Sequence, residues 1–308
     1  MACRFIGLTS MVTAIVFVIN NFLTYGANMP GAAAVFSGAV STGAMFQFGL
    51  YLTGIGVATW LTVSKPQLTE NAALMDKMSS VIIGAAFWSV LFVGITDALL
   101  SFLRVEGLHA VIFGDAIANK IGLSSWRGMF IHVPLMLVAL GISLRDRSVS
   151  VVWLILMVVL AELLIVLARF IFADEQTFMG DLVRFWYAAL FLFASAYTLK
   201  EEGHVRVDVL FAGFKKKTKA WVNATGTAAF GIPLCWVIIW RGLSGKSSMI
   251  NSPMLNFETS MSGFGMYVKY LMAAFLVVFA LSMMAQFTAY FFNALAQFGS
   301  SAQDGKEA

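Results

Sequence analysis

Charged residues are scarce in this chain of 308 residues: Asp, Glu, Lys and Arg make up 12% of it, whereas hydrophobic residues make up 60%. A soluble globular domain carries about 25% charged residues. The shortage excludes an ordinary soluble domain and predicts an integral membrane protein. The net charge is only +4, and the basic residues stand at the ends of apolar runs without interleaved aromatic rings. This pattern gives no indication of a nucleic-acid partner.

Cysteine and histidine are also rare. Cys3 precedes the first apolar run and Cys235 lies within a late one, so the pair predicts neither a disulfide nor a metal site. The three histidines, His109, His132 and His204, have no ligand spacing to one another. The chain has no Gly-rich phosphate loop, no paired catalytic carboxylates and no Ser-His-Asp or Cys-His arrangement. We therefore predict no enzyme activity, no metal and no cofactor.

Apolar runs dominate the chain, and a transmembrane helix needs about 20 such residues. Because the runs are continuous and do not alternate with polar residues, they favour helices over a barrel. The first run could be a secretory signal, but it exceeds an h-region of about 7–15 residues, which favours an uncleaved span. The predicted fold is an all-α integral membrane protein with about eight transmembrane helices, at 5–24, 34–63, 80–103, 128–144, 149–173, 183–199, 219–241 and 265–293.

Lys and Arg residues predict the orientation of these spans. More than half of them fall in alternate connections, including the cluster at 215–219, and cytoplasmic loops carry the basic excess. Both termini are therefore expected in the cytoplasm. The outer connection 104–127 holds an apolar segment too short to span, either interfacial or re-entrant. The outer connection 242–264 is rich in Ser, Gly and Asn and is predicted to be a flexible loop.

Three polar side chains fall within the apolar runs, where a charge costs about 2.5–3.5 kcal/mol on insertion scales. Glu162 lies near the middle of the fifth run. It either binds a proton or cation, or is protonated or paired at a helix contact, which we favour because one carboxyl stands there alone. Asp97 is expected to pair with Arg104 or Arg127. His132 is interpreted as a hydrogen-bonded packing residue.

The most distinctive segment is the compact charged run Gly-His-Val-Arg-Val-Asp at 203–208. It follows an apolar run directly and precedes the basic cluster at 215–219. In a surface helix, His204 and Asp208 would be i,i+4 neighbours, with Arg206 facing lipid headgroups. The alternation of apolar residues would equally suit a short extended turn.

Residues 149–293 resemble the small membrane (Q-type) subunit of a tripartite ATP-independent periplasmic (TRAP) transporter. The resemblance rests on the pair Arg169-Phe170 at the end of one helix, Asp181 at the opening of the next, and the His-Val-Arg-Val-Asp run at 204–208. Four spans precede the usual four-helix core, as in a long form of the subunit. The domain prediction is therefore a four-span extension at 1–148, a TRAP core at 149–298 and a disordered tail at 299–308.

The resemblance implies the small permease subunit of a sodium-coupled TRAP transporter in the bacterial inner (plasma) membrane. It implies a large elevator-type membrane subunit and a periplasmic binding protein that delivers an organic acid, besides membrane lipids. The small subunit would brace the large one and help dock the binding protein. The residues implied in holding its shape or its contact with the large subunit are Arg169, Asp181, His204, Arg206 and Asp208.

Two other functions stay open at this point. A self-sufficient proton- or ion-coupled carrier or channel would use Glu162 and Asp97, although few polar groups fall at the midplane. A membrane-anchored assembly factor for an unrelated complex is the third hypothesis.

Overall fold

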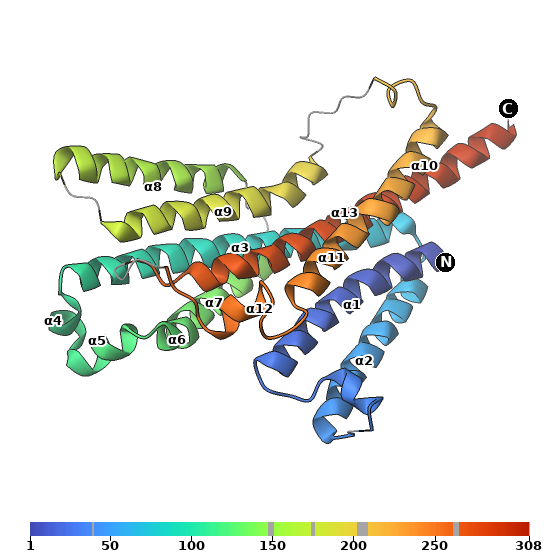
Figure 1. Cartoon of the computed structure of the whole chain (residues 1–308). Helices are drawn as coiled ribbons and strands as arrows, with labels where there is room; N and C mark the ends of the chain where they lie inside the picture. The colour runs from blue at the N-terminus through green and yellow to red at the C-terminus, as the bar shows by residue number, and fades with distance from the viewer. Residues whose placement is uncertain (39, 147–150, 174–175, 202–208, 261–264, 308) are drawn as a thin grey trace. The chain divides into compact units, whose positions relative to one another are not determined.

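The computed structural model describes residues 1–38, 40–146, 151–173, 176–201, 209–260 and 265–307, without the side chains of 151 and 300–307. In these residues the regular secondary structure is helical and includes no strand (Figure 1). The elements are α1 (Ala2–Tyr25), η1 (Ala32–Val35), α2 (Thr42–Ser64), α3 (Leu68–Val105), α4 (His109–Phe113), α5 (Asp115–Ile121), α6 (Ser124–Arg127), η2 (Gly128–His132), α7 (Val133–Arg145), α8 (Val151–Ile171), α9 (Thr177–Lys200), α10 (Lys216–Gly226), η3 (Thr227–Gly231), α11 (Ile232–Gly242), α12 (Asn251–Leu255) and α13 (Lys269–Glu307).

Eight helices among the described residues are long and apolar enough to cross a membrane. Six of them are α1, α2, α3, α8, α9 and α13. The other two are composite and run through 124–145 and 216–242. The predicted all-α fold with eight membrane helices is confirmed.

The second membrane helix begins later than the apolar run that predicted it. The run starts at residue 34, whereas α2 starts at Thr42. Gly38 has a φ of 81°, a left-handed conformation that interrupts a helix and that glycine adopts readily. The Ser41 hydroxyl then accepts a hydrogen bond from the backbone N–H of Ala44 at 3.2 Å, which caps the new helix.

Helices α3 and α13 are much longer than the membrane requires. They contain 38 and 39 residues, or about 57 Å at 1.5 Å per residue, against a hydrocarbon core of about 30 Å. Apolar runs mark the membrane part of a helix and not its ends, so the polar extensions were not predicted. Helix α13 continues to Glu307, whereas the sequence predicted a disordered tail from Gly299.

Two π-helical segments precede prolines within the composite spans. η2 ends two residues before Pro134, and η3 ends two residues before Pro233. Proline has no N–H, and its ring crowds the preceding turn of a helix. The wider turn of a π-helix relieves this crowding. Such segments often occur at functional sites. η2 includes His132.

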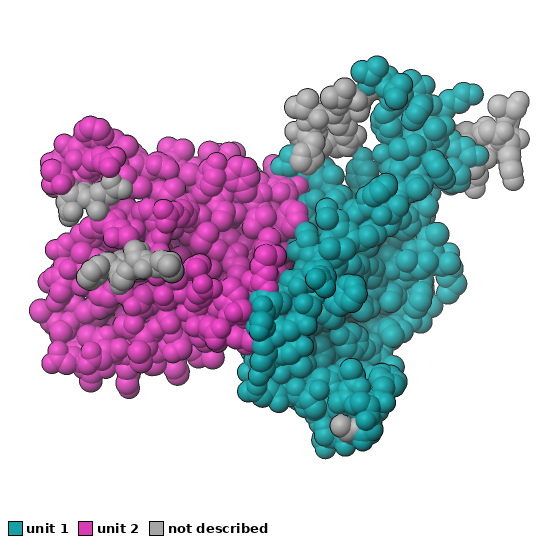
Figure 2. All heavy atoms as spheres, viewed as in Figure 1, with its two compact units in different colours: residues 1–79, 198–248, 280–308 teal, residues 80–197, 249–279 magenta. Residues whose placement is uncertain are grey.

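The described chain divides into two compact units (Figure 2). The first comprises residues 1–79, 198–248 and 280–308, and the second comprises 80–197 and 249–279. Helices α3, α9 and α13 contribute residues to both. The division between extension and core at residue 148 concerns family membership rather than compactness, and it stays a prediction.

In the first unit, a reciprocal pair of amides joins α1 to α2. Asn20 Nδ2 donates to the Gln47 carbonyl at 2.8 Å, and Gln47 Nε2 donates to Asn20 Oδ1 at 2.9 Å. Both side chains are buried. Lipid provides no hydrophobic drive between apolar helices, so such polar contacts and close packing hold membrane helices together.

In the second unit, aromatic rings from α9 and α13 form the centre of the core. The Phe275 ring lies 5.2 Å from the Phe185 ring and 4.9 Å from the Phe193 ring. Trp186 Nε1 donates to the Val90 carbonyl of α3 at 3.1 Å. These contacts fix α3, α9 and α13 against one another where they carry the polar side chains described below.

The two long connections, 104–127 and 242–264, contain short helices among their described residues. The first contains the short helices α4 and α5, and the second contains α12, where the sequence predicted a flexible loop. The Tyr270 N–H donates to the Glu258 carbonyl at 3.0 Å, which ties this connection to the start of α13. Cys3 and Cys235 are both free, as expected.

Candidate functional site

A largely buried polar network lies in the second unit, around the carboxylate of Asp97 on α3. Its Oδ1 atom accepts a hydrogen bond from Arg127 Nη1 at 2.8 Å and lies 3.2 Å from His132 Nε2. Its Oδ2 atom accepts from the backbone N–H of Tyr267 at 2.6 Å. The side chains of Asp97, Arg127 and His132 have no exposed surface. We call these four residues and Tyr270 the Asp97 network.

The remaining contacts orient the two side chains that bind Asp97, those of His132 and Arg127. His132 Nδ1 lies 2.8 Å from the Tyr270 hydroxyl, and the two rings are stacked. A neutral histidine satisfies both contacts when Nε2–H donates to Asp97 and Nδ1 accepts from the tyrosine. Arg127 Nε donates to the Ile121 carbonyl at 3.0 Å, and its guanidinium lies 4.1 Å from the centre of the Tyr267 ring.

Arg104, near the end of α3, extends this arrangement. Its Nη2 donates to the Gly265 carbonyl at 2.7 Å and its Nη1 donates to the Tyr267 hydroxyl. Its guanidinium also lies 4.7 Å from the Tyr267 ring, so Arg104 and Arg127 both contact one aromatic ring. The predicted partner of Asp97 was Arg104 or Arg127, and the structure pairs it with Arg127.

Asp181, on α9, holds the residue next to Tyr267. Its Oδ2 accepts from the backbone N–H of Met266 at 3.0 Å, and its Oδ1 lies 3.3 Å from the Ser260 hydroxyl and 3.4 Å from Arg184 Nη1. Two carboxylates from different helices therefore accept from consecutive backbone N–H groups just before α13. Such charge-assisted bonds are about twice as strong as neutral ones, so they fix the entry of the chain into α13.

Helix α8 presents a different kind of surface. One face packs into the core of the second unit through Leu154, Met157 and Ala161. Much of the remaining circumference is exposed, and one part of it carries residues at alternating spacings of three and four, the a/d spacing of packed helices. We call this set the α8 stripe: Val152, Ile155, Val159, Glu162, Val166 and Arg169.

Glu162 is the only carboxylate on this stripe and stands near the middle of a 21-residue helix. It is exposed, and among the described residues it has no hydrogen-bond or ion-pair partner. Arg169 lies two turns further along the stripe. The structure therefore brings these two predicted site residues onto one surface, away from the Asp97 network.

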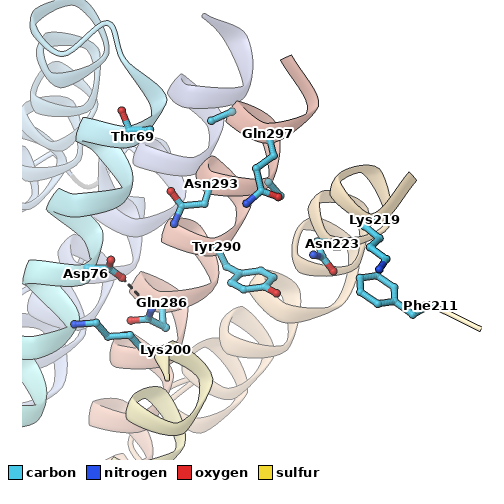
Figure 3. A pocket seen from close by; sticks show the side chains of 12 residues that line it. Thr69, Asp76, Lys200, Phe211, Lys219, Asn223, Gln286, Tyr290, Asn293 and Gln297 are labelled. Atoms are coloured by element: carbon cyan, nitrogen blue, oxygen red, sulfur yellow. Dashed lines mark hydrogen bonds between the residues drawn. The ribbon is translucent and has the colours of Figure 1, made fainter. Parts of the chain in front are cut away.

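His204, Arg206 and Asp208 lie outside the described residues. The segments on either side of them, Lys200 at the end of α9 and Phe211, line a cavity of about 500 Å³ in the first unit (Figure 3). We call it the polar cavity, because amides, hydroxyls and two lysines make up most of its wall.

Residues 155–297 match the family model described as Tripartite ATP-independent periplasmic transporters, DctQ component. Through this region the chain is similar to the DctQ component of these transporters. No curated protein and no solved structure matches the chain. DctQ is the small component of TRAP transporters, so the chain is a multi-pass inner-membrane component of a transport system. The helices before residue 155 fit a long form of the subunit.

The DctQ match clarifies what the Asp97 network joins. Asp97, Arg127 and His132 precede the DctQ region, whereas Tyr267 and Tyr270 belong to it. The network thus fastens the additional N-terminal helices of the second unit to a DctQ helix. A largely buried network whose polar groups mostly bind one another holds a structure together. Among the described residues, no three His, Cys, Asp or Glu side chains are placed to hold a metal.

Sequence reasoning missed the residues at the start of α13. The backbone N–H groups of Met266 and Tyr267 bind carboxylates that lie 85 and 170 residues away, and the Tyr270 hydroxyl binds His132, 138 residues away. No spacing rule connects such distant positions. The one available signal was the clustering of Tyr, Met and Gly before a long apolar run.

Proposed function

We propose that this chain is the small permease subunit of a sodium-coupled TRAP transporter for an organic acid. It would brace a large elevator-type membrane subunit and help a periplasmic binding protein to dock, with both of its own termini in the cytoplasm. The family match supports a TRAP small component. The basic excess in alternate connections supports the orientation, and the resemblance of the sequence to this family supports the finer assignments.

The observation that carries the bracing role is the α8 stripe. Apolar side chains on a membrane helix are stable against lipid, so exposed valines alone indicate no partner. A carboxyl in mid-span is different, because it costs about 2.5–3.5 kcal/mol at the bilayer centre on insertion scales. Glu162 is exposed and lies outside the face of α8 that packs into the core of its own unit, so we infer that a partner outside the chain satisfies it.

The side chains of the α8 stripe are also suited to packing against a partner helix. Val159 and Val166 are β-branched and 54% and 47% exposed, and they flank Glu162 at spacings of three and four residues. β-Branched side chains at such positions are rigid and pack well against a neighbouring helix. A helix of the large subunit with a hydrogen-bond donor at the depth of Glu162 would fit this surface.

Co-purification with variant subunits tests the proposal. Glu162→Lys places the wrong charge against the donor and is expected to reduce recovery of the large subunit at least tenfold, whereas Glu162→Gln retains part of it. The matched control is Leu160→Lys, which inserts the same charge at similar depth on the opposite side of the helix, where Leu160 is 52% exposed. Equal loss with Leu160→Lys and Glu162→Lys would reject the stripe as the contact surface.

The same variants separate this function from a self-sufficient carrier. If Glu162 binds a transported ion, Glu162→Gln abolishes uptake while the large subunit still co-purifies in full. If Glu162 is an assembly contact, uptake falls only in proportion to the large subunit that is lost.

A further inference from the structure

The wall of the polar cavity carries two basic side chains among its described residues. Lys200 and Lys219 contribute ammonium groups to its wall, and Asp76 contributes a carboxylate. Gln286 Nε2 donates to Asp76 Oδ1 at 2.9 Å (Figure 3), so this carboxylate already has a neutral partner. Among the described residues, neither lysine has a carboxylate within ion-pair distance. The two lysines of the lining therefore favour a ligand that carries negative charge.

Neutral polar groups complete the lining. Asn223, Tyr290 and Asn293 come from α10 and α13, and their side chains lie around the same space (Figure 3). They offer hydrogen-bond donors and acceptors at several heights along the cavity. The volume of about 500 Å³ falls within the range of about 300–1,000 Å³ that is usual for small-ligand sites.

The cavity lies where several membrane helices begin or end. Lys200 is the last residue of α9, Lys219 stands in the first turn of α10, and Thr69 is the second residue of α3. Trp221, two residues beyond Lys219, is 58% exposed, and exposed tryptophans mark the membrane–water interface. The site is therefore at the level of lipid headgroups.

We propose that the polar cavity binds the phosphodiester headgroup of an anionic glycerophospholipid. A lysine of the wall neutralises the phosphate, and basic pockets between membrane helices bind such headgroups elsewhere. The carboxylate of Asp76 accepts from a headgroup hydroxyl, which a glycerol headgroup has and a choline headgroup lacks. The acyl chains remain in the bilayer beside the exposed faces of the helices.

Lipid binding to the purified full-length chain tests this site. The chain in a neutral detergent is titrated with phosphatidylglycerol, phosphatidylcholine or the soluble glycerol 1-phosphate. Native mass spectrometry measures the fraction of the chain that carries each ligand. The expected result is at least tenfold tighter binding of phosphatidylglycerol than of phosphatidylcholine. Equal binding of the two lipids would overturn the proposal. If glycerol 1-phosphate displaces the lipid at equal concentration, the ligand is a free phosphate ester and the lipid assignment is wrong.

Variants locate the binding within the chain. Lys219→Gln and Lys200→Gln are each expected to weaken phosphatidylglycerol binding about fivefold, since a basic side chain near an anionic headgroup contributes roughly that factor. Lys219→Arg keeps the charge and retains binding. The matched control is Lys216→Gln, which removes the same charge from the same helix at an exposed position outside the cavity.

The control decides between a site and general attraction. Lys216→Gln is expected to change binding less than twofold. If Lys216→Gln weakened phosphatidylglycerol binding as much as Lys219→Gln does, the basic cluster at 215–219 would attract anionic lipid without a specific site. That result would overturn the proposal. Should a lysine variant fail to fold, the preference of the unaltered chain between the two lipids still decides the outcome.

Discussion

Breaking the pair of Asp97 and Arg127 is predicted to destabilise the protein more than any exposed substitution. In Asp97→Leu, Arg127 stays buried with a positive charge that no carboxylate balances. Its Nη2 atom has no hydrogen-bond partner among the described residues, and the Ile121 carbonyl and the Tyr267 ring that the guanidinium also contacts carry no full negative charge. The Tyr267 N–H also loses its acceptor.

The expected decrease in the free energy of unfolding follows from these two lost interactions. Removing one member of a buried ion pair costs about 3–5 kcal/mol, and an unsatisfied buried N–H adds about 1–3 kcal/mol. Arg127→Met leaves the Asp97 charge buried, at a similar cost of about 3–5 kcal/mol. The double variant Asp97→Leu/Arg127→Met leaves no unbalanced charge, so it is expected to be several kcal/mol more stable than the sum of the single losses predicts.

Unfolding of the full chain in mixed detergent, followed by tryptophan fluorescence, measures these free energies. Asp115→Asn, an exposed aspartate on α5, is the control and is expected to change stability by less than about 0.5 kcal/mol. The reasoning is refuted if Asp97→Leu behaves like this control, or if the effects of the two single variants simply add.

Two further predictions concern the same end of the second unit. Asp181→Ala removes the acceptor of the Met266 N–H and is expected to cost about 1–3 kcal/mol in the same unfolding assay, with no change in substrate preference; a neutral result would contradict its role as an anchor. Burial and two neighbouring guanidinium groups lower the pKa of His109 below its ordinary 6.5, so the folded state binds this proton less readily than the unfolded state. The contribution of His109 to the free energy of unfolding is then complete above about pH 6.5 and declines as the pH falls from 6.5 toward the lowered pKa. His109→Gln is expected to flatten that part of the pH–stability curve, and an unchanged curve would contradict the assignment.

The membrane helices could be predicted because length and apolarity are direct requirements of the bilayer. Their ends could not, because they depend on local chemistry. Gly38 and Ser41 place the start of α2 after the start of its apolar run. Helix α3 begins with polar residues, which hydropathy does not mark as part of a membrane helix. The family resemblance was likewise readable, because Arg169 and Asp181 stand in a recognisable order along the chain.

The candidate site was predictable only in part. Asp97 was expected to pair with one of two arginines, but the sequence could not choose between them, since both stand at the ends of spans. The sequence also could not show which positions of α8 are exposed, because lipid-facing and buried positions of a membrane helix are both apolar. Glu162 alone showed that one side of the helix is unlike the others.

Assembly with a large subunit is the claim on which the proposed function depends. The most direct measurement is purification of the full chain from its native membrane in mild detergent, followed by quantitative mass spectrometry. The account predicts a large multispan permease in stable, near-equal amount. Recovery of the chain alone, or only with copies of itself, across mild detergents would contradict the subunit role and leave an independent carrier as the function to test.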